Sequence, residues 1–209
     1  SVARYFKKIL RIPKGPLMSN MYLACFDNGV FVVDPSVSPD KVSSEVTNVI
    51  AILITHGHYD HIKYVDEWHE RFPDAPIYMN PADQVLLGDP RDNCSFMDGL
   101  AKVFDFPYVK AEGNINVGGI DIDVLSTPGH TMGSVCYMFR KEDKQYLFTG
   151  DTVFAGSVGR TDMAGGSFAL LNKSIEAVSK LDPETLIFPG HGPESTVGDE
   201  VKYNPFFAG

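Results

Sequence analysis

The most constraining feature of this sequence is a seven-residue segment, THGHYDH, that directly follows an apolar run. The segment covers Thr55 to His61 and holds three of the six histidines in the chain together with Asp60. The run VIAILIT, which begins at Val49, is rich in β-branched residues and predicts a strand that is buried on both faces. A helical pattern follows from about Ile62. Because ligands of α/β proteins usually bind in loops at strand ends, we expect a functional site here.

The spacing inside this segment suits metal coordination. His56 and His58 are two residues apart, so both side chains can point the same way from an extended loop. Asp60 and His61 come at the start of the helix and can point toward a second position close by. Imidazoles and a carboxylate in such proximity are suitable ligands for Zn²⁺ or a similar divalent ion. We see no other reason to crowd these groups together, and therefore interpret the segment as a metal site.

Three further candidate ligands occur in one kind of local setting. His130 in TPGHT, Asp151 in FTGDT and His191 in FPGHG each follow an apolar run and a glycine. A glycine there fits a backbone that turns sharply beside an ion. Alone, His130 would be interpreted as a hydrogen-bonded turn residue, but the shared setting favours a ligand. The sixth histidine, His69 in EWHER, is expected to be a solvated surface residue.

Apolar patterning along the whole chain predicts an α/β fold. Strands are expected at MYLACF, VFVVD, VIAILIT, IYMN, INV, IDIDVLST, SVCYMFR, QYLFTG and TLIFPG. Helices are expected over 39–48, 62–72, 81–87 and 168–181. Strand-rich and helical segments thus alternate twice, and no linker interrupts them. We therefore expect one domain over residues 1–209, built as a four-layer αββα sandwich of two mixed β-sheets with helices on the outer faces.

Patterning is weak between residues 88 and 112, where we expect a long loop with one helical turn. Loops of this length are often functional. Its apolar side chains could line a pocket, belong to the core or form a dimer contact. They are Phe96, Met97, Phe104 and Phe106.

Composition argues against several classes of partner. The net charge of −9 disfavours a nucleic acid, because phosphate binding requires clustered Lys and Arg. No apolar run is long enough to span a bilayer, and SVARYFKKIL lacks the features of a signal peptide. The cysteines at positions 25, 94 and 136 are too widely spaced for a disulfide framework or a Cys-rich zinc site. We expect free thiols, a cytoplasmic location and no membrane partner, while the oligomeric state stays open.

The order HxHxDH, TPGHT, GDT and PGHG resembles the metallo-β-lactamase superfamily. The resemblance extends from about Gly15 to Phe206 and implies an αββα sandwich with one or two metal ions at the edge between the sheets. Two divalent ions are expected, with zinc favoured and iron or manganese as alternatives. The ligands implied are His56, His58 and His130 for the first metal, Asp60, His61 and His191 for the second, and Asp151 as a bridge.

The resemblance also implies hydrolysis by a hydroxide that bridges the two ions. Such ions lower the pKa of the shared water and polarise a substrate carbonyl. Asp60 and Asp151 are accordingly the residues expected to take part in catalysis. An amino-acid nucleophile is not expected, because the segment AGSVG has Ala155 in place of the first glycine of a Gly-x-Ser-x-Gly elbow and no free histidine partner.

Within the superfamily, THxHxDH, TPGHT and FTGDTVF resemble the glyoxalase II-like group, the hydroxyacylglutathione hydrolases. These enzymes hydrolyse S-hydroxyacyl thioesters of glutathione. GSVGRTD and PGHGPESTVGDEVKYNPF resemble more closely the short bacterial members of that group. The helical domain that helps longer members to bind glutathione is not expected after His191, so a different or smaller thiol is an alternative. A small-molecule thioester is the expected substrate.

The main alternative is an oxidoreductase of the same superfamily. The GRTD stretch also occurs in persulfide dioxygenases, which bind one iron through two histidines and one aspartate. The matching residues here are His56, His130 and Asp151, whereas the tail PGHGPESTVG favours a hydrolase. A non-catalytic metal-binding module is disfavoured because all seven ligand positions are filled. Classical β-lactamase activity is disfavoured because those zinc enzymes use a different set of ligands at the second site.

Three residues near the motifs are candidates for substrate binding. Tyr59 could face a pocket or pack against the following helix. Lys63 stands where many relatives have glycine and would place a cation near the mouth of the site, or would simply be solvated on the first helical turn. Arg160 could contact substrate, or form with Asp162 a buried pair that fixes the loop after Asp151.

Overall fold

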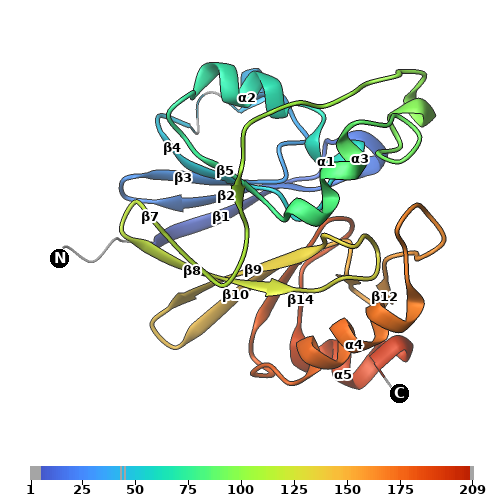
Figure 1. Cartoon of the computed structure of the whole chain (residues 1–209). Helices are drawn as coiled ribbons and strands as arrows, with labels where there is room; N and C mark the ends of the chain where they lie inside the picture. The colour runs from blue at the N-terminus through green and yellow to red at the C-terminus, as the bar shows by residue number, and fades with distance from the viewer. Residues whose placement is uncertain (1–5, 43, 45, 208–209) are drawn as a thin grey trace.

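Two six-stranded β-sheets lie face to face in the structure, a computed structural model that describes residues 6–42, 44 and 46–207 (Figure 1). The first sheet has the strand order β1–β2–β3–β4–β5–β6. Strands β1 to β3 pair antiparallel and β3 to β6 pair parallel, so this sheet is mixed. Its strands are β1 (Phe6–Ile12), β2 (Met21–Phe26), β3 (Gly29–Val33), β4 (Val49–Leu53), β5 (Ile77–Met79) and β6 (Val109–Lys110).

The second sheet is mixed as well, with the strand order β14–β13–β10–β9–β8–β7. Only β10 and β13 pair parallel, and the other neighbours pair antiparallel. Its strands are β7 (Asn114–Val117), β8 (Ile120–Ser126), β9 (Val135–Lys141), β10 (Lys144–Gly150), β13 (Leu186–Pro189) and β14 (Ser195–Thr196). A small hairpin of β11 (Val153–Phe154) and β12 (Ser157–Val158) follows β10.

Helices cover the outer faces of both sheets, which confirms the expected αββα order (Figure 1). The first sheet carries α1 (Tyr59–Ile62), α2 (Val65–Arg71) and α3 (Gln84–Leu87), and the second carries α4 (Phe168–Ser179) and α5 (Val197–Tyr203). Short 3₁₀ helices are η1 (Pro16–Met18), η2 (Pro39–Lys41), η4 (Pro81–Asp83), η5 (Ser95–Asp98) and η6 (Pro205–Phe207). Within the described residues, no helix has the length and apolar character that crossing a membrane would require.

Alternation along the strands explains why the layers stack. All six residues of β2 are buried, since successive side chains point to opposite faces of the sheet. Met21 and Leu23 join the cluster under the helices, whereas Tyr22 joins the cluster between the two sheets. The inter-sheet cluster is rich in aromatic rings, such as Phe31 and Phe139 with centroids 5.1 Å apart. The central strands are therefore apolar on both faces, as predicted for VIAILIT.

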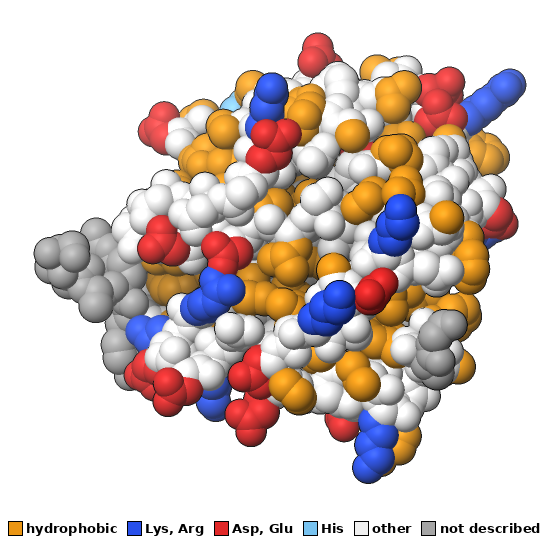
Figure 2. Space-filling model, turned by 60° about the horizontal axis from the view of Figure 1, so that its bottom comes forward, with side chains coloured by type: hydrophobic (Ala, Val, Ile, Leu, Met, Phe, Trp, Pro, Cys, Tyr) orange, Lys and Arg blue, Asp and Glu red, His pale blue; other side chains and the backbone are white. Residues whose placement is uncertain are grey.

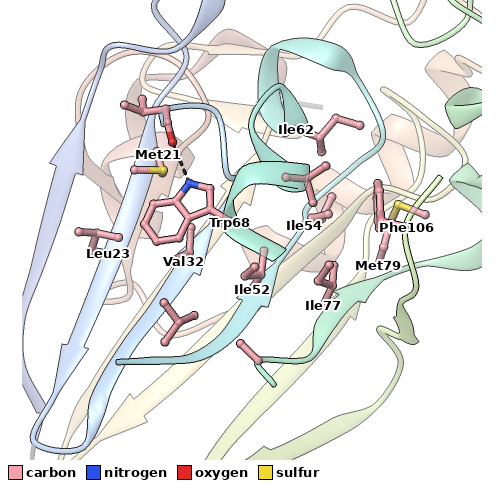
Figure 3. Close-up of a cluster of buried hydrophobic side chains, with 14 of the residues drawn as sticks. Met21, Leu23, Val32, Ile52, Ile54, Ile62, Trp68, Ile77, Met79 and Phe106 are labelled. Carbon is pink, nitrogen blue, oxygen red and sulfur yellow. Dashed lines mark hydrogen bonds between the residues drawn. The ribbon is translucent and has the colours of Figure 1, made fainter. Parts of the chain in front are cut away.

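The layer between the first sheet and its helices is organised around Trp68 of α2 (Figure 3). This side chain is fully buried, and its indole N–H donates a hydrogen bond of 2.8 Å to the carbonyl of Val37. Ile52 and Ile54, at the end of β4, belong to the same cluster. This packing fixes the strand end from which the THGHYDH segment departs.

The carboxyl ends of the key strands meet at one edge of the sandwich. Strand β4 runs parallel to β3, and β8, β10 and β13 all run in one direction. Hydrogen bonds tie the two sheets together there, from Val135 N to Thr55 O (3.0 Å) and from the Tyr137 hydroxyl to Ile54 O (2.6 Å). The loops after these strands are thus brought together although they are far apart in sequence.

Two expected helices differ from the structure. Of the helix expected over 39–48, the structure shows the 3₁₀ turn η2, which ends where Val42 leaves helical geometry (φ −132°), and a further 3₁₀ residue at position 44. Positions 43 and 45 lie outside the described residues. The helix expected over 62–72 is divided into α1 and α2. Tyr64 separates them because its N–H donates to Pro35 O (2.9 Å) rather than continuing the helix.

Other local expectations can be compared directly with the structure. The three cysteines, all within the described residues, carry thiols and form no disulfide. In the segment 88–112, Phe104 and Phe106 are buried in the core, whereas Phe96 and Met97 are exposed. On the face shown in Figure 2, lysines and arginines are scattered singly among aspartates and glutamates. That face lacks the clustered positive charge that binding to a phosphate backbone requires.

Candidate metal centre

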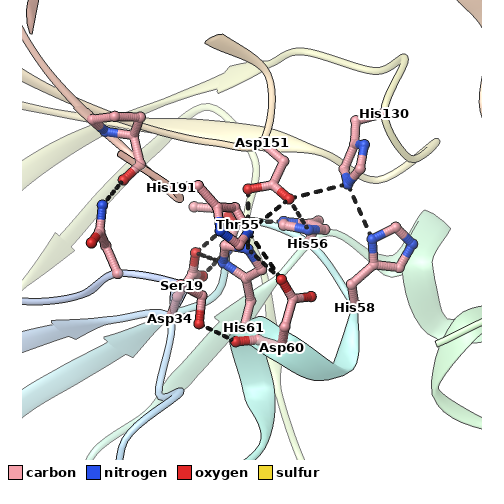
Figure 4. A network of polar contacts seen from close by, with 12 residues as sticks. Ser19, Asp34, Thr55, His56, His58, Asp60, His61, His130, Asp151 and His191 are labelled. Atoms are coloured by element: carbon pink, nitrogen blue, oxygen red, sulfur yellow. Dashed lines mark hydrogen bonds and ion pairs between the residues drawn. The ribbon is translucent and has the colours of Figure 1, made fainter. Parts of the chain in front are cut away.

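The seven predicted ligands lie together at the edge where the strand ends meet (Figure 4). They form two groups, and within each group the potential ligand atoms all lie within 4.8 Å of one another. We call them the first and second subsites. The first subsite contains His56, His58 and His130, and the second contains Asp60, His61, Asp151 and His191.

Asp151, after β10, lies between the two subsites. Its Oδ2 is 3.4 Å from His130 Nε2 and 3.7 Å from His56 Nε2, both in the first subsite. The same oxygen is 3.5 Å from His191 Nε2, and Oδ1 is 3.0 Å from His61 Nε2, both in the second. This carboxylate therefore faces imidazoles of both groups, as a bridging ligand would.

Glycines allow the backbone to pass this close to the ligands. A Cβ at Gly190 would lie 2.4 Å from Asp151 Oδ1 and 2.5 Å from His61 Cε1. At Gly150 the backbone has φ +53°, and a Cβ would lie 2.5 Å from the Thr55 hydroxyl oxygen. A side chain at either position would displace a ligand or the group that orients it.

Three imidazoles are oriented by acceptors on the ring nitrogen that faces away from the site. His61 Nδ1 bonds to Asp34 Oδ2 (2.8 Å), and His130 Nδ1 donates to the carbonyl of Arg160 (2.8 Å). His191 Nδ1 likewise donates to the carbonyl of Leu17 (3.2 Å). Because these oxygens accept the Nδ1 proton, Nε2 of each ring is left as the free ligand atom.

His56 is oriented through a relay. Its Nδ1 lies 2.9 Å from the Thr55 hydroxyl oxygen, and that hydroxyl donates to Asp34 Oδ2 (2.7 Å). Asp34 also accepts the backbone N–H of Thr55 (2.8 Å). One buried carboxylate thus orients a histidine of each subsite, His61 directly and His56 through a hydroxyl.

The arrangement fits bound cations. His61 Nε2 and His191 Nε2 are 3.3 Å apart, and His58 Nδ1 and His130 Nε2 are 3.1 Å apart. Lone pairs that face each other at such distances repel unless a proton or a metal ion lies between them. His56 Nε2 is also buried without a hydrogen-bond partner among the described residues. A set of imidazole nitrogens and carboxylate oxygens suits zinc, iron or manganese.

The two subsites differ in protonation when no metal is bound. Burial, with help from His130, lowers the pKa of His58 to about 4, and burial lowers the pKa of His56 well below its usual value. Burial acts in the same direction on His191, but its contacts with Asp151 and Asp60 raise the pKa to about 9. Neighbouring carboxylates also hold the pKa of His61 well above its usual value against the effect of burial.

Three supporting residues were not among the predicted site residues. Asp34 has φ +57° and ends the segment VFVVD beside β4, so a polar residue at that strand end was the available signal. Asp83 accepts the backbone N–H groups of Gly57 (2.9 Å) and Gly133 (2.7 Å), which ties together the loops after β4 and β8. Asn20 donates to Pro189 O (2.9 Å) and so holds the turn before His191. Asn20 precedes a strand in SNMYL, a position from which a residue near the metal edge could be expected, whereas nothing local to Asp83 signals its role.

Two adjoining cavities open over this centre. The metal cavity, of about 340 Å³, has potential ligands at its base and apolar walls that include Met97, Phe154 and Met163. The adjoining cavity, of about 320 Å³, lies beside α1. The two share four lining residues, which are Leu17, Asp60, Cys94 and Met97.

Two of the predicted substrate-binding residues line the adjoining cavity. The Tyr59 hydroxyl donates to Asp98 Oδ2 (2.6 Å), and its ring is buried. Lys63 Nζ is 3.7 Å from the same carboxylate oxygen and lies over the ring of Tyr64, 5.4 Å from its centroid. Both side chains are therefore beside, rather than within, the metal cavity.

Arg160 lines the metal cavity, but the expectation that it forms a buried pair with Asp162 is wrong. The guanidinium pairs with Asp162 at 2.6 and 2.8 Å, yet the pair is exposed and not buried. The backbone carbonyl of Arg160 points inward to His130, so the side chain is left at the surface. His69, expected to be solvated, is instead half-buried on α2.

Comparisons with known proteins agree with this geometry. The chain is 36% identical over 208 residues to the probable metallo-hydrolase YqgX of Bacillus subtilis, covering 95% of this chain and 97% of that protein. It is 29% identical over 184 residues to the hydroxyacylglutathione hydrolase GloC of Haemophilus influenzae, covering 84% and 85%. A crystal structure described as BLEG-1 B3 metallo-beta-lactamase superposes with a TM-score of 0.88 at 34% identity, covering 97% and 100%.

A model of one family matches most of the chain. The match extends over residues 15–191 and so includes all seven residues of the two subsites. The chain belongs to the metallo-β-lactamase superfamily.

Proposed function

We propose that this protein is a metal-dependent hydrolase that cleaves S-acyl or S-hydroxyacyl thioesters of glutathione or another small thiol. The observation that carries the proposal is the position of Asp151, which faces both subsites at the base of an apolar-walled cavity. The two subsites would hold a pair of divalent ions, with zinc expected. When bound, such a pair would supply Lewis acidity and a water of lowered pKa.

The chain itself would orient the substrate and handle protons. Asp60 lines both cavities, and its Oδ2 lies 3.0 Å from His191 Nε2. From that position its carboxylate can take up the proton of an attacking water. Met97, Phe154 and Met163 would hold the acyl group and exclude bulk water. The thiol half of the thioester would extend past Asp60 into the adjoining cavity.

Named relatives support the proposal at two levels. The Bacillus relative is described as a probable metallo-hydrolase, which favours hydrolysis. The Haemophilus relative is described as a hydroxyacylglutathione hydrolase, which favours a thioester substrate. A structure described as a di-iron-bound form of TTHA1623, 34% identical with a TM-score of 0.82 over 94% of this chain, supports including iron among the metals tested.

The test combines metal loading with a substrate panel. Protein reconstituted separately with zinc, iron and manganese would be assayed on S-D-lactoylglutathione and on acyl thioesters of smaller thiols. We expect hydrolysis of at least one thioester, lost in Asp151→Asn and retained in Asp143→Asn, which changes an aspartate in the β9–β10 turn. Absence of thioester hydrolysis with every metal would refute the proposal.

A second candidate activity is β-lactam hydrolysis. The 34% identity to the structure described as a B3 metallo-beta-lactamase favours this activity. The ligand set expected at the second subsite argued against classical β-lactamase activity, so the identity reopens the question. A chromogenic cephalosporin in the same assay separates the two candidates. Turnover of the cephalosporin well above that of every thioester would make the β-lactam the preferred substrate class.

The persulfide dioxygenase alternative needs a different metal count. Its three matching residues, His56, His130 and Asp151, do lie together, with Asp151 Oδ2 facing both rings. Elemental analysis of the purified native protein distinguishes the thioester hydrolase from the persulfide dioxygenase. Close to two metals per chain supports the hydrolase, whereas one iron per chain with oxygen uptake on a persulfide supports the oxidoreductase.

A further inference from the structure

The β11–β12 hairpin and the residues just after it contact a histidine of each subsite. Phe154, at the end of β11, packs edge-on against the ring of His191 in the second subsite, with ring centroids 5.9 Å apart. The chain that leaves β12 reaches Arg160, whose carbonyl accepts the Nδ1 proton of His130 in the first subsite (2.8 Å). The position of the hairpin therefore affects how imidazoles of both subsites are held.

The hairpin is too small to fix its own position. Its strands have two residues each and form a separate two-stranded sheet, with the pairs Val153–Val158 and Phe154–Ser157. It belongs to neither six-stranded sheet. Because an isolated two-stranded hairpin is at best marginally stable, contacts from other parts of the chain must hold it.

Two buried side chains at the end of the chain supply such contacts. Glu200 of α5 is 4% exposed, and its Oε1 accepts the backbone N–H of Gly156 in the hairpin turn (2.8 Å). Its Oε2 accepts the hydroxyl of Ser195 on β14. Asn204, just after α5, is 2% exposed, and its Nδ2 donates to the carbonyl of Ser157 in β12 (3.0 Å) and to Glu200 Oε1 (3.0 Å).

Glu200 is a buried carboxylate that belongs to neither subsite. Removing a carboxylate from water is unfavourable unless hydrogen bonds replace its hydration. Its three donors are a backbone N–H, a hydroxyl and an amide, all neutral groups, and the N–H belongs to the hairpin. Hydrogen bonds to an ionised acceptor are shorter and stronger than bonds between neutral groups, so this carboxylate is suited to fixing the hairpin turn.

We propose that Glu200 and Asn204 are positioning residues for the metal centre. They hold the β11–β12 hairpin where Phe154 restrains the ring of His191 and where the chain after β12 presents a carbonyl to His130. Neither Glu200 nor Asn204 is among the residues that line the metal cavity or the adjoining cavity, so their effect passes through the hairpin. The inference rests on the metal-dependent part of the proposed function and adds the residues that fix ligand geometry from outside the cavities.

Cobalt is a direct probe of this role, because the visible absorption of bound Co²⁺ depends on the geometry of its ligands. Titrating the protein with Co²⁺ alone, without substrate, measures both the spectrum and the affinity. We expect Glu200→Ala to alter the spectrum and to weaken cobalt binding about tenfold, as for other residues that orient metal ligands. Glu200→Gln keeps the shape and an acceptor for the Gly156 N–H, and should restore most of the affinity.

Ile77→Ala is the matched control for a general loss of stability. Ile77 lies in β5, is 2% exposed and belongs to the core cluster under the helices of the first sheet, so its truncation should lower the melting temperature but leave the cobalt spectrum unchanged. Asn204→Ala removes the amide that bonds to the Ser157 carbonyl and keeps the carboxylate of Glu200. It should weaken cobalt binding severalfold, and it takes the place of Glu200→Ala if that variant does not fold.

A double variant tests whether the effect passes through Phe154. Phe154→Leu keeps an apolar side chain but removes the ring that packs against His191. Residues that act through one shared contact give losses that do not add in free energy. We therefore expect Phe154→Leu combined with Glu200→Ala to lower the cobalt affinity by less than the product of the two single fold-losses.

The outcomes separate positioning from the proposed function. An unchanged cobalt spectrum and affinity in Glu200→Ala and Asn204→Ala, an equal change in Ile77→Ala, or fold-losses that multiply in the double variant would overturn the positioning role while thioester hydrolysis stood. Coupled losses of cobalt binding in a protein that hydrolyses no thioester with any metal would support the positioning role and refute the thioesterase.

Discussion

The first subsite consists of three imidazoles, whereas the second combines two imidazoles with two carboxylates. Both are built at the same sheet edge, and Asp34 orients one histidine of each. They differ in access to solvent, since the side chain of His56 is 1% exposed and that of His191 is 27% exposed.

Histidines buried away from carboxylates and histidines buried beside carboxylates differ in protonation when no metal is bound. In the first subsite, burial holds the pKa of His56 and His58 low, so both rings are neutral near pH 7. In the second, carboxylates hold the pKa of His61 and His191 high, so both rings carry protons that balance the carboxylates. In the first subsite only His130, whose pKa Asp151 raises against the effect of burial, must release a proton to bind a metal, whereas the second must release protons from two rings.

The largest expected effect comes from removing the residue that both subsites share. Asp151→Asn should lower metal content at both subsites and reduce turnover by more than the roughly 10–100-fold typical of losing a second-shell partner. Elemental analysis and thioester kinetics would measure this. Full metal content in the variant would show that Asp151 is not the link between the subsites.

Removing one ligand from the first subsite should affect the two subsites unequally. His58→Ala should cut turnover by orders of magnitude with the fold retained, because the other two imidazoles cannot hold the ion alone. The four residues of the second subsite are unchanged and should still bind metal. Metal titration with a circular dichroism control checks both points, and undiminished activity would contradict the metal mechanism.

Asp34→Asn should weaken the second subsite more than the first. His61 loses a direct carboxylate partner, whereas His56 is reached only through the Thr55 hydroxyl. We expect roughly 10–100-fold weaker metal binding at the second subsite. Thr55→Val is the matched variant, since it removes the hydroxyl next to His56 and should affect the first subsite. Equal losses at both subsites in both variants would mean that Asp34 acts only on the fold.

The affinity of the second subsite should depend more steeply on pH. Metal displaces protons from His61 and His191, whose pKa values are raised, to about 9 for His191. In the first subsite only His130 has a raised pKa. Between pH 6 and 9 affinity should rise about tenfold per pH unit for each proton released, up to two protons against one. Calorimetry in buffers of different ionisation enthalpy counts the protons, and equal counts would contradict the difference.

The smallest effect is expected outside both subsites. His69 lies on α2 and belongs to neither group of ligands. His69→Ala should leave metal content and activity unchanged, apart from a minor change in melting temperature because the ring is half-buried. A large loss of activity would show that a histidine outside the two subsites matters to the reaction.

The strand ends and the polar residues that follow them could be predicted from local pattern. The apolar run before Thr55 predicts a buried strand, and every residue of the observed strand β4 is indeed buried. The histidine motif follows this strand directly. The expected sandwich is confirmed for the same reason, since continuous apolar strands require a layer on each face. The seven residues do converge, and their role as metal ligands stays a prediction.

Contacts between distant segments could not be predicted in this way. Asp83 bonds to Gly133, which is 50 positions away, and Asn20 bonds to Pro189, which is 169 positions away. The break within the helix expected over 62–72 has a related cause, because the Tyr64 N–H bonds to the loop after β3, and the helix α2 begins only at Val65.

The sequence by itself determined which side chains gather at the sheet edge, because residue type and strand periodicity are local properties. Only the tertiary structure decided that Asp34 orients both subsites, that Lys63 lines the adjoining cavity and that the Ser36 hydroxyl has no hydrogen-bond partner within residues 6–42, 44 and 46–207. Those features depend on which atoms of remote segments come within hydrogen-bond distance. Packing of the two sheets sets that distance, and no single segment of the chain encodes it.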